Sequence, residues 1–344
     1  MADDRDQNLP GLDLDVVAAF LRANVDPHIG ACTGHVVVGG KSNMTYLVGD
    51  GRRQWIVRRP PLGHVLETAH DMGREARVMS ALAPTAVPVP QVLAVCTDSG
   101  PIGAPFYVME YVPGTAFRDE SELRELGAAR TRKIADEMID VLADLHAVDP
   151  SAVGLGELGR PEGFLGRQVS RWTRQLEASR SRELAGADEL RAALADRVPT
   201  ESAARIVHGD YRLDNLLVDA SGVRAVIDWE MATIGDPLTD LALLVVYGRV
   251  AEIPGGEVIT TISRAPGHPS AAQLVERYAA RTGPLPPAGL GFYLGLAAFK
   301  LAVILEGIHL RHSQGHTVGA GFDTVGALVE PLFGEGIALL KEWS

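Results

Sequence analysis

Residues 208–230 read HGDYRLDNLLVDASGVRAVIDWE, and the fold expected for the chain follows from this stretch. Two apolar runs, 216–219 and 223–229, flank the residues Ala-Ser-Gly, which suit a turn. If the runs pair as an antiparallel hairpin, Asn215 enters one strand and Asp228 leaves the other, so both side chains should meet at its open end. Amide and carboxylate oxygens are the ligands that Mg²⁺ prefers in proteins. The stretch therefore predicts a magnesium site held by Asn215 and Asp228.

Asp210 lies just before the predicted hairpin, in a loop that begins with His-Gly. From there its carboxylate can accept a proton from a substrate hydroxyl, while a metal ion neutralises charge on a transferring phosphoryl group. The spacing from Asp210 to Asn215, Asp-x-x-x-x-Asn, matches the protein-kinase catalytic-loop pattern. With Asp228 in register across the hairpin, the three residues predict phosphoryl transfer with Asp210 as the base.

Four neighbouring polar residues have ordinary structural explanations. His208 is expected to be a packed, hydrogen-bonded loop residue, and Asp214 a solvated one. Asp236 precedes Pro237, and Asp at the N-cap with Pro at the first helical position is typical of a helix start. Asp240 is expected to brace the catalytic loop.

The composition excludes some classes of protein. The chain has 344 residues and a formal net charge of −12, with 46% hydrophobic and 22% charged residues, which is typical of a globular protein. A general nucleic-acid-binding protein needs a basic surface for phosphates, so nucleic acid is not an expected partner. The two cysteines, Cys32 and Cys96, have no metal-ligand spacing and suit a reducing compartment.

The chain offers no expected signal or membrane segment. Residues 1–7 are polar and acidic, unlike a secretory signal. The longest apolar stretch, 290–310, contains Lys300, Glu306 and His309, and central charges are costly in lipid. We expect a buried helix of a soluble domain there, and a cytoplasmic protein that is a monomer or a homodimer.

The order of predicted elements indicates two lobes and an α+β fold class. Residues 1–112 read as a small β-rich lobe, and residues 113–344 as a larger, mainly helical lobe with the hairpin as its one clear strand pair. In the first lobe the predicted strands are 36–38, 44–48, 54–58, 87–95 and 106–112, and the predicted helices are 14–21 and 71–82. In the second lobe the predicted helices are 134–146, 166–178, 271–281, 290–311 and 324–340.

The segment VIDWEMATIGDPLTDLA, residues 226–242, carries Asp-Trp-Glu followed by Gly-Asp-Pro-x-x-Asp-Leu-Ala. With the HxD of 208–210, it resembles the catalytic segment of the aminoglycoside phosphotransferase and choline kinase superfamily, in which the protein-kinase HRD becomes HxD and DFG becomes DxE/D. The resemblance covers roughly residues 25–340. It is closest to the branch that includes kinase-like domains fused to acyl-CoA dehydrogenases.

This resemblance implies a bilobal protein-kinase-like fold with a small antiparallel β-rich N-lobe and a larger, mainly helical C-lobe. It implies that Asp210 is the catalytic base or hydroxyl orienter and that Asn215 and Asp228 bind Mg²⁺. By the same resemblance, Glu230 lies near the metal or the acceptor substrate.

The glycine-rich segment of residues 39–43 lies between strand-like runs, where backbone N–H groups and a serine hydroxyl can cover phosphates. Gly40, Ser42 and Asn43 are the candidates for this contact. The segment does not match GxGxxG, and Gly-Gly in a hairpin often only turns the chain.

Arg58 ends the predicted strand WIVRR, at the position where protein kinases place the Lys that binds the α- and β-phosphates. Glu75 on the next predicted helix is its expected partner, and Arg still binds phosphate, through a flat fork rather than a point charge. The segment VMEYV resembles the hinge whose backbone meets adenine, at Glu110 and Val112. These residues predict a site for ATP or GTP.

The acceptor is less determined. Arg171 shares one face of a predicted helix with Arg167 and Arg174, at spacings that can hold an anionic handle such as coenzyme A phosphates. A solvated basic face is the plainer interpretation, and the acidic composition would suit a cationic aminoglycoside. The predicted function is a small-molecule kinase that transfers the γ-phosphate of ATP or GTP to a hydroxyl of a metabolite or antibiotic, with a hydroxyacyl-CoA and an aminoglycoside as candidate acceptors.

Two other functions stay open. A catalytically weak, nucleotide-binding pseudokinase acting through a protein partner gains some support from Arg58 at the lysine position. A metal-dependent hydrolase using the same carboxylates has less, because the sequence lacks a second cluster of oxygen ligands.

Overall fold

The structure is a computed structural model that describes residues 9–37, 43–62, 71–200, 203–285, 289–315 and 324–343. The chain forms two compact units. Unit 1 comprises residues 1–114 and 217–232, and unit 2 comprises residues 115–216 and 233–344. The first boundary lies two residues after the predicted one. The hairpin at 217–232 was expected in the second lobe, and it groups with unit 1 instead.

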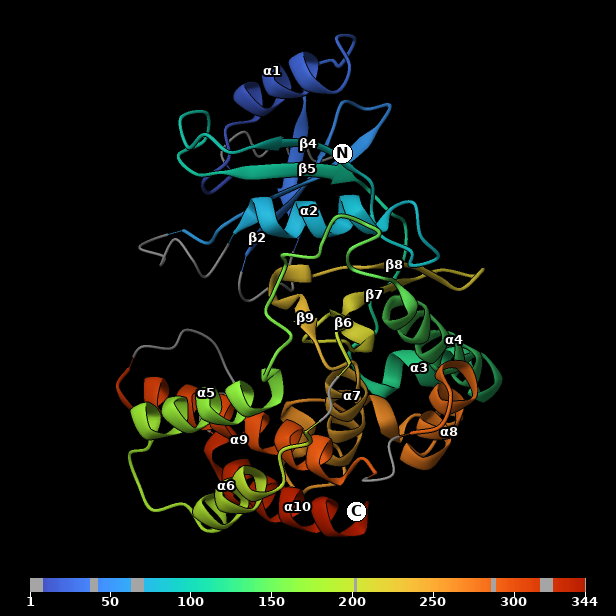
Figure 1. Ribbon diagram of the computed structural model, residues 1–344. Helices are drawn as coiled ribbons and strands as arrows, with labels where there is room; N and C mark the ends of the chain where they lie inside the picture. Colours follow the sequence, from blue (N-terminus) through green and yellow to red (C-terminus); the bar gives the residue numbers. More distant parts are fainter. Residues whose placement is uncertain are drawn as a thin grey trace. The chain divides into compact units, whose positions relative to one another are not determined.

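Unit 1 is built on one antiparallel five-stranded sheet with the order β1-β2-β3-β5-β4 (Figure 1). Its strands are β1 (Thr33–Val36), β2 (Met44–Gly49), β3 (Gln54–Arg59), β4 (Val92–Cys96) and β5 (Phe106–Glu110). Two of the predicted strands need correction. β1 lies three residues earlier than the predicted 36–38, and β4 starts only at Val92 because Pro88 and Pro90 cannot donate to a sheet ladder.

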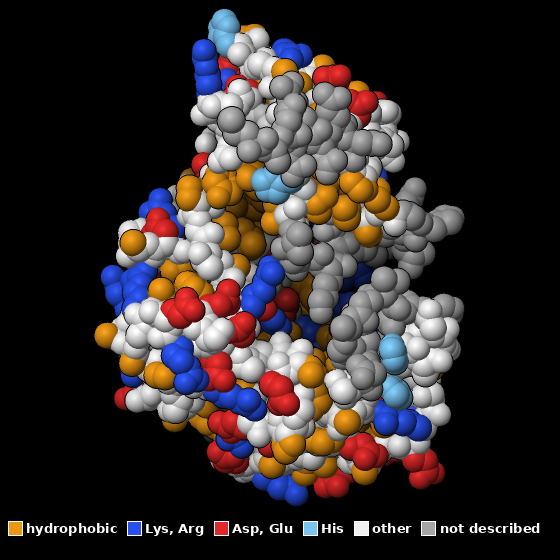
Figure 2. Space-filling model, turned by 180° about the vertical axis from the view of Figure 1, so that it is seen from behind, with side chains coloured by type: hydrophobic (Ala, Val, Ile, Leu, Met, Phe, Trp, Pro, Cys, Tyr) orange, Lys and Arg blue, Asp and Glu red, His pale blue; other side chains and the backbone are white. Residues whose placement is uncertain are grey.

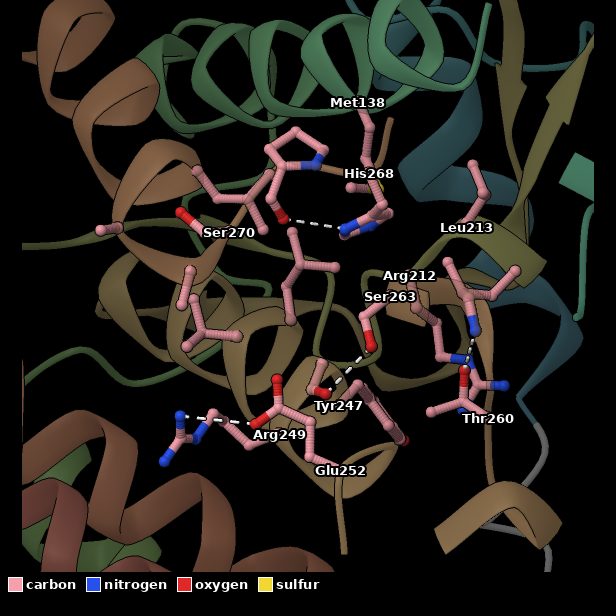
Figure 3. Close-up of a pocket in the computed structure, with 18 of the residues that line it drawn as sticks. Met138, Arg212, Leu213, Tyr247, Arg249, Glu252, Thr260, Ser263, His268 and Ser270 are labelled. Carbon is pink, nitrogen blue, oxygen red and sulfur yellow. Dashed lines mark hydrogen bonds and ion pairs between the residues drawn. The ribbon is translucent and has the colours of Figure 1, made fainter. Parts of the chain in front are cut away.

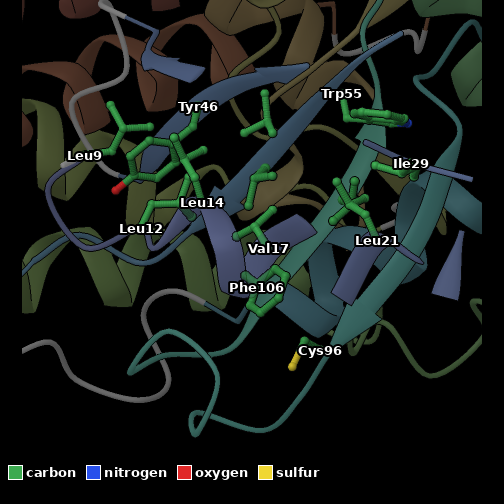
Figure 4. Packing of buried hydrophobic residues seen from close by; sticks show 13 residues of the cluster. Leu9, Leu12, Leu14, Val17, Leu21, Ile29, Tyr46, Trp55, Cys96 and Phe106 are labelled. Atoms are coloured by element: carbon green, nitrogen blue, oxygen red, sulfur yellow. The ribbon is translucent and has the colours of Figure 1, made fainter. Parts of the chain in front are cut away.

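One face of this sheet carries the main core of unit 1 (Figure 4). Helix α1 (Leu14–Asn24) begins at Asp13, whose carboxylate accepts the N–H groups of Asp15 and Val16. The helix packs its apolar side chains against alternate residues of β2, β3 and β5, because successive side chains of a strand point to opposite faces. The core side chains include Leu14, Val17, Leu21, Tyr46, Val48, Trp55, Val57, Phe106 and Val108.

Helix α2 (Met72–Leu82) lies on the opposite face of the sheet from α1 (Figure 1). Its N-cap is Asp71, which accepts the N–H of Arg74, so the start of the helix agrees with the prediction. The helix is amphipathic, yet Glu75 on it is 1% exposed. A buried carboxylate in a core-facing position needs a partner, and this one marks the candidate site.

The predicted hairpin is present: β7 (Leu216–Val218) pairs with β8 (Val223–Val226). Asp219 and Gly222 exchange backbone hydrogen bonds across the turn, and the Asp219 carboxylate accepts the N–H of Ser221. The hairpin groups with unit 1 because the Val226 N–H donates to the Pro88 carbonyl. The short helix η2 (Trp229–Met231) that follows it packs against α2. Local sequence patterns do not predict these contacts, because they join residues far apart in the chain.

Unit 2 is mainly helical, as predicted. Its helices are α3 (Glu120–Leu126), α4 (Ala128–Ala147), α5 (Phe164–Ser179), α6 (Ala187–Asp196), α7 (Leu238–Val250), α8 (Ala271–Thr282), α9 (Gly291–Ser313) and α10 (Val329–Glu342). A strand pair that the sequence did not reveal, β6 (Arg205–Val207) with β9 (Thr233–Gly235), brackets the catalytic segment. Each strand has only three residues, which is too short for a periodicity to be read.

Helix α9 is the predicted apolar helix, and it lies at the centre of unit 2. By length and composition it could span a membrane, but 83% of its most apolar window is buried inside the protein. It packs against α5, α7 and α10. On the face in Figure 2, acidic and basic side chains are interspersed over the lower part of the view, so the net charge of −12 forms no single patch there.

Candidate active site

The predicted nucleotide-binding residues of unit 1 form a compact charged group. The Arg58 Nε lies 3.1 Å from Glu75 Oε2, and an Nη2 hydrogen of Arg58 is donated to Asp228 Oδ1. Glu75 also accepts the Trp229 N–H through Oε1, at 3.2 Å. The predicted pair of Arg58 and Glu75 is therefore present, and the segment after the hairpin is attached to it.

The electrostatics of this group follow from burial. Arg58 is 8% exposed and Glu75 1%, so both charges are removed from most of their water. Burial raises the pKa of the Glu75 carboxyl to about 7, even though Arg58 opposes the shift. Burial works against the charge of Arg58 too, but the carboxylates around it keep its pKa above the usual value. The guanidinium is thus a fixed positive charge.

Asp228 has a strained backbone. Its φ is 68°, and in the described part of the chain it is the only non-glycine residue with a positive φ. Such a conformation costs of order 1–3 kcal/mol for a residue with a side chain, and it is concentrated at functional sites. Local packing thus holds this carboxylate in a direction that an ordinary strand end would not give.

Asn43 and Glu230 contact each other, although the sequence placed them in different roles. The Asn43 Nδ2 donates to Glu230 Oε2 at 2.9 Å, and Asn43 is 4% exposed. The contact fixes the end of the glycine-rich segment beside the Asp-Trp-Glu motif. The other two candidates of that segment, Gly40 and Ser42, lie outside the described residues.

The predicted hinge residues lie at the end of β5. The Glu110 N–H donates to the Gln91 carbonyl at 2.9 Å, and the Gln91 N–H donates to Glu110 Oε1 at 3.0 Å. These bonds hold the chain before Val112, which is half-buried. A row of apolar side chains, Leu47, Ile56 and Met109, crosses the neighbouring strands in register on the face opposite α1.

The catalytic-loop residues belong to unit 2, and Asp210 is held there by neutral groups. The Tyr247 hydroxyl donates to Asp210 Oδ1 at 3.2 Å, and Asn215 Nδ2 donates to Oδ2 at 3.2 Å and to the Asp210 carbonyl at 2.9 Å. Burial, with the Asp210 charge adding to it, raises the pKa of Tyr247 to about 12, so this hydroxyl keeps its proton. The Asp210 carboxylate is therefore an oriented acceptor.

Gly209, the residue before Asp210, is held from both sides. Gly209 has a φ of 85°, which favours glycine, and its N–H donates to Asp240 Oδ1 at 2.8 Å. The Lys300 ammonium donates to the Gly209 carbonyl at 2.8 Å. Burial lowers the pKa of Lys300, while the carboxylates of Asp210 and Asp240 oppose the shift.

Asp240 has the bracing role that was predicted. It accepts the His208 N–H at 2.7 Å through Oδ2, and His146 Nε2 lies 3.3 Å from the same oxygen. Burial alone would raise the pKa of Asp240, but the hydrogen bond from His146 and the charges around it bring the value below normal. His208 is fully buried and packs against the Tyr211 ring, as expected for a structural loop residue.

Two other structural expectations need adjustment. Asp214 is not merely solvated, because it forms an ion pair with Arg212. Helix α7 begins at Leu238, and Asp236 Oδ1 accepts the Leu238 N–H from just outside the helix while its Oδ2 accepts the Tyr293 hydroxyl. Pro237 is the N-cap, so the helix starts one residue later than predicted, and the Asp236 carboxylate caps it from the position before.

The predicted arginine face on α5 is divided. Arg167 donates to the carbonyls of Glu162 and Arg160, so its guanidinium holds its own loop. Arg171 lies with its Cζ 5.2 Å from the centroid of Trp172, and the Lys300 ammonium lies 5.7 Å from the same ring. Arg171, but not Arg167, therefore contributes positive charge near the catalytic loop.

A cavity of about 380 Å³ in unit 2 is lined in part by Arg212, Leu213 and Tyr247 (Figure 3). The Arg212 guanidinium lies 4.5 Å from the centre of the Tyr247 ring, and the Tyr247 hydroxyl donates to Asp210. Its apolar lining includes Met138, Leu213, Leu244, Val245, Ile262 and Leu274. Charged side chains also line it, namely Arg212, Asp214, Arg249, Glu252 and Glu342. Its polar lining includes Ser263 and His268, whose pKa is lowered by burial.

Each unit holds one of the two predicted magnesium ligands. In unit 2, Asn215 directs its amide nitrogen to Asp210, so its carbonyl oxygen is the atom left for a ligand. In unit 1, the Asp228 side chain is 30% exposed. Carboxylate and amide oxygens, completed by phosphate and water, are the shell Mg²⁺ prefers. In the described part of the chain, no group of three or more His, Cys, Asp or Glu side chains could hold a metal ion.

Lys300 and Tyr247 are functional candidates that sequence reasoning missed. A charge inside the apolar stretch 290–310 was noticed only as a reason against a membrane span. Such a charge in a buried helix needs a partner, and that requirement was the signal available in the sequence. Tyr247 had no signal beyond its place on α7.

Comparison with known proteins agrees with this geometry. The profile of the phosphotransferase enzyme family matches residues 33–286. Acyl-CoA dehydrogenase family member 10 of Mus musculus is 35% identical over 301 residues, which is 85% of this chain. The chain spans only 28% of the length of that relative. The expected resemblance, including its branch, is confirmed.

Two solved structures share the fold. A Ralstonia eutropha protein provisionally assigned as an aminoglycoside phosphotransferase is 34% identical, with a TM-score of 0.84 over 96% of this chain and 99% of that one. A thermostable mutant of an aminoglycoside phosphotransferase, in a ternary complex with AMP-PNP and hygromycin B, is 19% identical with a TM-score of 0.60. It covers 94% of this chain and 97% of its own. The kinase-like α+β fold class is confirmed.

Proposed function

The chain belongs to the phosphotransferase enzyme family, and we propose that it transfers the γ-phosphate of ATP or GTP to a hydroxyl of a small molecule. The observation that carries the proposal is the catalytic loop: Asp210 is oriented by Tyr247 and Asn215, with no cation bound directly to its carboxylate among the described residues. A carboxylate in this state can accept a hydrogen bond from an alcohol and take its proton as the bond to phosphorus forms.

Arg58 supplies the fixed positive charge for the nucleotide. Its guanidinium is held by Glu75 on one side and Asp228 on the other, and its fork suits phosphate oxygens. The backbone of Glu110 and Val112 and the apolar row of the sheet suit a nucleotide base. When bound, Mg²⁺ would be held by Asn215 and Asp228 and would neutralise charge on the phosphates.

The acceptor we propose is a hydroxylated metabolite with an apolar arm, with a hydroxyacyl-CoA ahead of an aminoglycoside. Lys300 and Arg171 place positive charge beside the catalytic loop, which opposes a polyamine. The cavity next to Tyr247 has an apolar wall and a volume of about 380 Å³, which lies in the range of small-ligand sites. The acyl-CoA dehydrogenase name of a relative points in the same direction.

A screen of γ-phosphate transfer tests the function. The protein with Mg²⁺ and γ-labelled ATP or GTP is offered hydroxyacyl-CoAs, aminoglycosides, macrolides and choline-like alcohols, and Asp210→Asn serves as the inactive control. Labelled product with a hydroxyacyl-CoA, absent with Asp210→Asn, supports the proposal. Transfer to aminoglycosides alone would overturn the acceptor class.

The alternative is a nucleotide-binding pseudokinase that acts through a protein partner. It is favoured by Arg58 at a position that kinases fill with Lys. It predicts tight nucleotide binding without turnover on any acceptor, so the same screen with a nucleotide-binding measurement separates the two. We also propose, from the sequence alone, a cytoplasmic protein that is a monomer or a homodimer.

A further inference from the structure

Helix α9 carries two charged side chains within an otherwise apolar stretch, and they have different partners. Glu306 is fully buried and pairs with Arg182, whose Nη2 lies 2.9 Å from Oε2 and also donates to the Gly326 carbonyl at 2.6 Å. Lys300 lies six residues earlier, which is about 9 Å along the helix and about 240° around it. The two charges therefore face different parts of unit 2.

The partner of Lys300 is the peptide that precedes the base. Gly209 donates its N–H to the Asp240 carboxylate and accepts a hydrogen bond from the Lys300 ammonium at its carbonyl, both at 2.8 Å. Both bonds involve an ionised group, and such bonds are roughly twice as strong as neutral ones. The two peptide groups that flank Gly209 are thus held by α7 and α9, one by each helix, and the next residue is Asp210.

Holding this peptide fixes the direction of the Asp210 side chain. Gly209 has a φ of 85°, so a rotation about its backbone would turn the following carboxylate. Asp240 restrains the peptide group on the N–H side of Gly209. On the other side, Lys300 holds the Gly209 carbonyl, and the N–H of that peptide group, which belongs to Asp210, donates to His208 Nδ1 at 3.3 Å. Tyr247 and Asn215 then complete the orientation at the carboxylate itself.

We propose that Lys300 is a positioning residue for the phosphoryl transfer: with Asp240 it clamps the Gly209 peptide and so sets the angle at which Asp210 meets the acceptor hydroxyl. The inference rests on the proposed function, because it assigns Lys300 a part in that reaction. A displacement of about 1 Å at a reacting group can cost about 100-fold in rate, so a positioning residue is visible in kcat.

The test compares Lys300→Met with two other variants. Met matches the length and shape of Lys and suits the apolar surroundings of α9, so the variant should fold. We expect kcat to fall about 10–100-fold, while KM for nucleotide and acceptor changes less than about 3-fold. Lys300→Arg keeps a charged donor and should recover part of kcat. Glu306→Gln, a second charge removal on the same helix, should lower the melting temperature but leave kcat within about 2-fold.

Hydrogen exchange supplies a readout that needs no activity. Exchange of backbone amides in the peptide 205–215 should rise in Lys300→Met, but not in Glu306→Gln, because only the first variant releases the Gly209 carbonyl. A kcat within 2-fold of wild type in Lys300→Met, or an equal loss in Glu306→Gln, overturns the positioning role. If wild type transfers phosphate to no acceptor, the proposed function fails, and unchanged exchange at 205–215 in Lys300→Met would then overturn the clamp as well.

Discussion

The two groups of site residues are held by different forces. In unit 1, Arg58, Glu75 and Asp228 are joined by ion pairs, with Arg58 and Glu75 almost wholly buried. In unit 2, Asp210 accepts hydrogen bonds from the Tyr247 hydroxyl and the Asn215 carboxamide. The Lys300 ammonium donates to the carbonyl of the neighbouring residue, Gly209, and not to Asp210 itself. The first group is a network of one guanidinium and two carboxylates, and the second is an oriented acceptor.

This difference separates the expected roles. A network with a fixed guanidinium suits binding of anionic phosphates, because the positive charge is in place before the ligand arrives. A carboxylate held by directed hydrogen bonds is oriented before the alcohol arrives and can accept its hydrogen. Substitutions in unit 1 should therefore change nucleotide affinity or stability, and substitutions in unit 2 should change kcat.

The largest effect is expected at Asp210. Asp210→Asn keeps the shape and the hydrogen bonds to Tyr247 but removes the basic oxygen, and kcat should fall by about 10²–10⁴. Nucleotide affinity, measured by calorimetry, should stay within about 3-fold because the charged network of unit 1 is untouched. Asp214→Asn in the same loop serves as the matched control and should keep most of the activity. A full loss of nucleotide binding in Asp210→Asn would contradict the proposed separation of roles, in which unit 1 binds the nucleotide and Asp210 acts only in the transfer step.

The second effect concerns Asp228. Asp228→Asn removes one metal-binding charge and one partner of Arg58, so affinity for the nucleotide with Mg²⁺ should fall about 10–100-fold. Without Mg²⁺ the affinity should change little. Asp219→Asn, at the turn of the same hairpin, is the control. Equal losses with and without Mg²⁺ would argue that Asp228 serves Arg58 rather than the metal.

The third effect is a dependence of stability on pH. The pKa of Glu75 is about 7 in the folded protein and 4.5 ordinarily, so the folded state binds this proton more tightly than the unfolded state. The stability it contributes is fully present below pH 4.5 and is lost as the pH rises through about 7. Glu75→Gln should abolish this loss, which is at most ~3 kcal/mol.

Calorimetric unfolding of wild type and Glu75→Gln between pH 5 and 8 checks this sign. The melting temperature of wild type should fall relative to that of the variant as the pH increases. Parallel curves would mean that Glu75 is ionised throughout this range in the folded protein, and that Arg58 fully compensates its burial.

The smallest effect is expected at Tyr247. Tyr247→Phe removes one hydrogen bond to Asp210 and leaves the ring under Arg212 in place, so kcat should fall about 3–10-fold with KM unchanged. Steady-state kinetics with both substrates measure it. If the KM for the acceptor instead rises by a larger factor than kcat falls, Tyr247 binds the acceptor rather than orienting Asp210.

Sequence reasoning reached the residues whose signals are local. The hairpin at 216–226 has apolar runs and a turn within eleven residues, and Asp210 and Asn215 follow a fixed spacing, so both could be predicted. Glu75 was found by analogy with the kinase pair. The short strands β6 and β9, by contrast, are separated by the 25 residues 208–232, and each is too short for a period.

Lys300 and Tyr247 could not be assigned from the sequence because their partners are distant. Lys300 contacts a carbonyl 91 residues away, and Tyr247 contacts a carboxylate 37 residues away. Neither contact has a local pattern. The ion pair of Asp214 with Arg212 also depends on a distant residue, because Arg212 takes a direction set by its stacking on Tyr247. The expectation that Asp214 is merely solvated therefore missed this partner.

The sequence by itself determined which residue types are available for phosphoryl transfer and the order in which the chain presents them, because spacing and periodicity are properties of the covalent chain. Tertiary structure alone decided what each of them touches: that Asn43 bonds to Glu230, that the hairpin groups with unit 1, and that an ammonium from α9 meets the peptide before Asp210. Those contacts depend on the packing of whole helices and sheets. The free energy gained by burying apolar surface in that packing is spread over many side chains, so no single motif in the sequence predicts it.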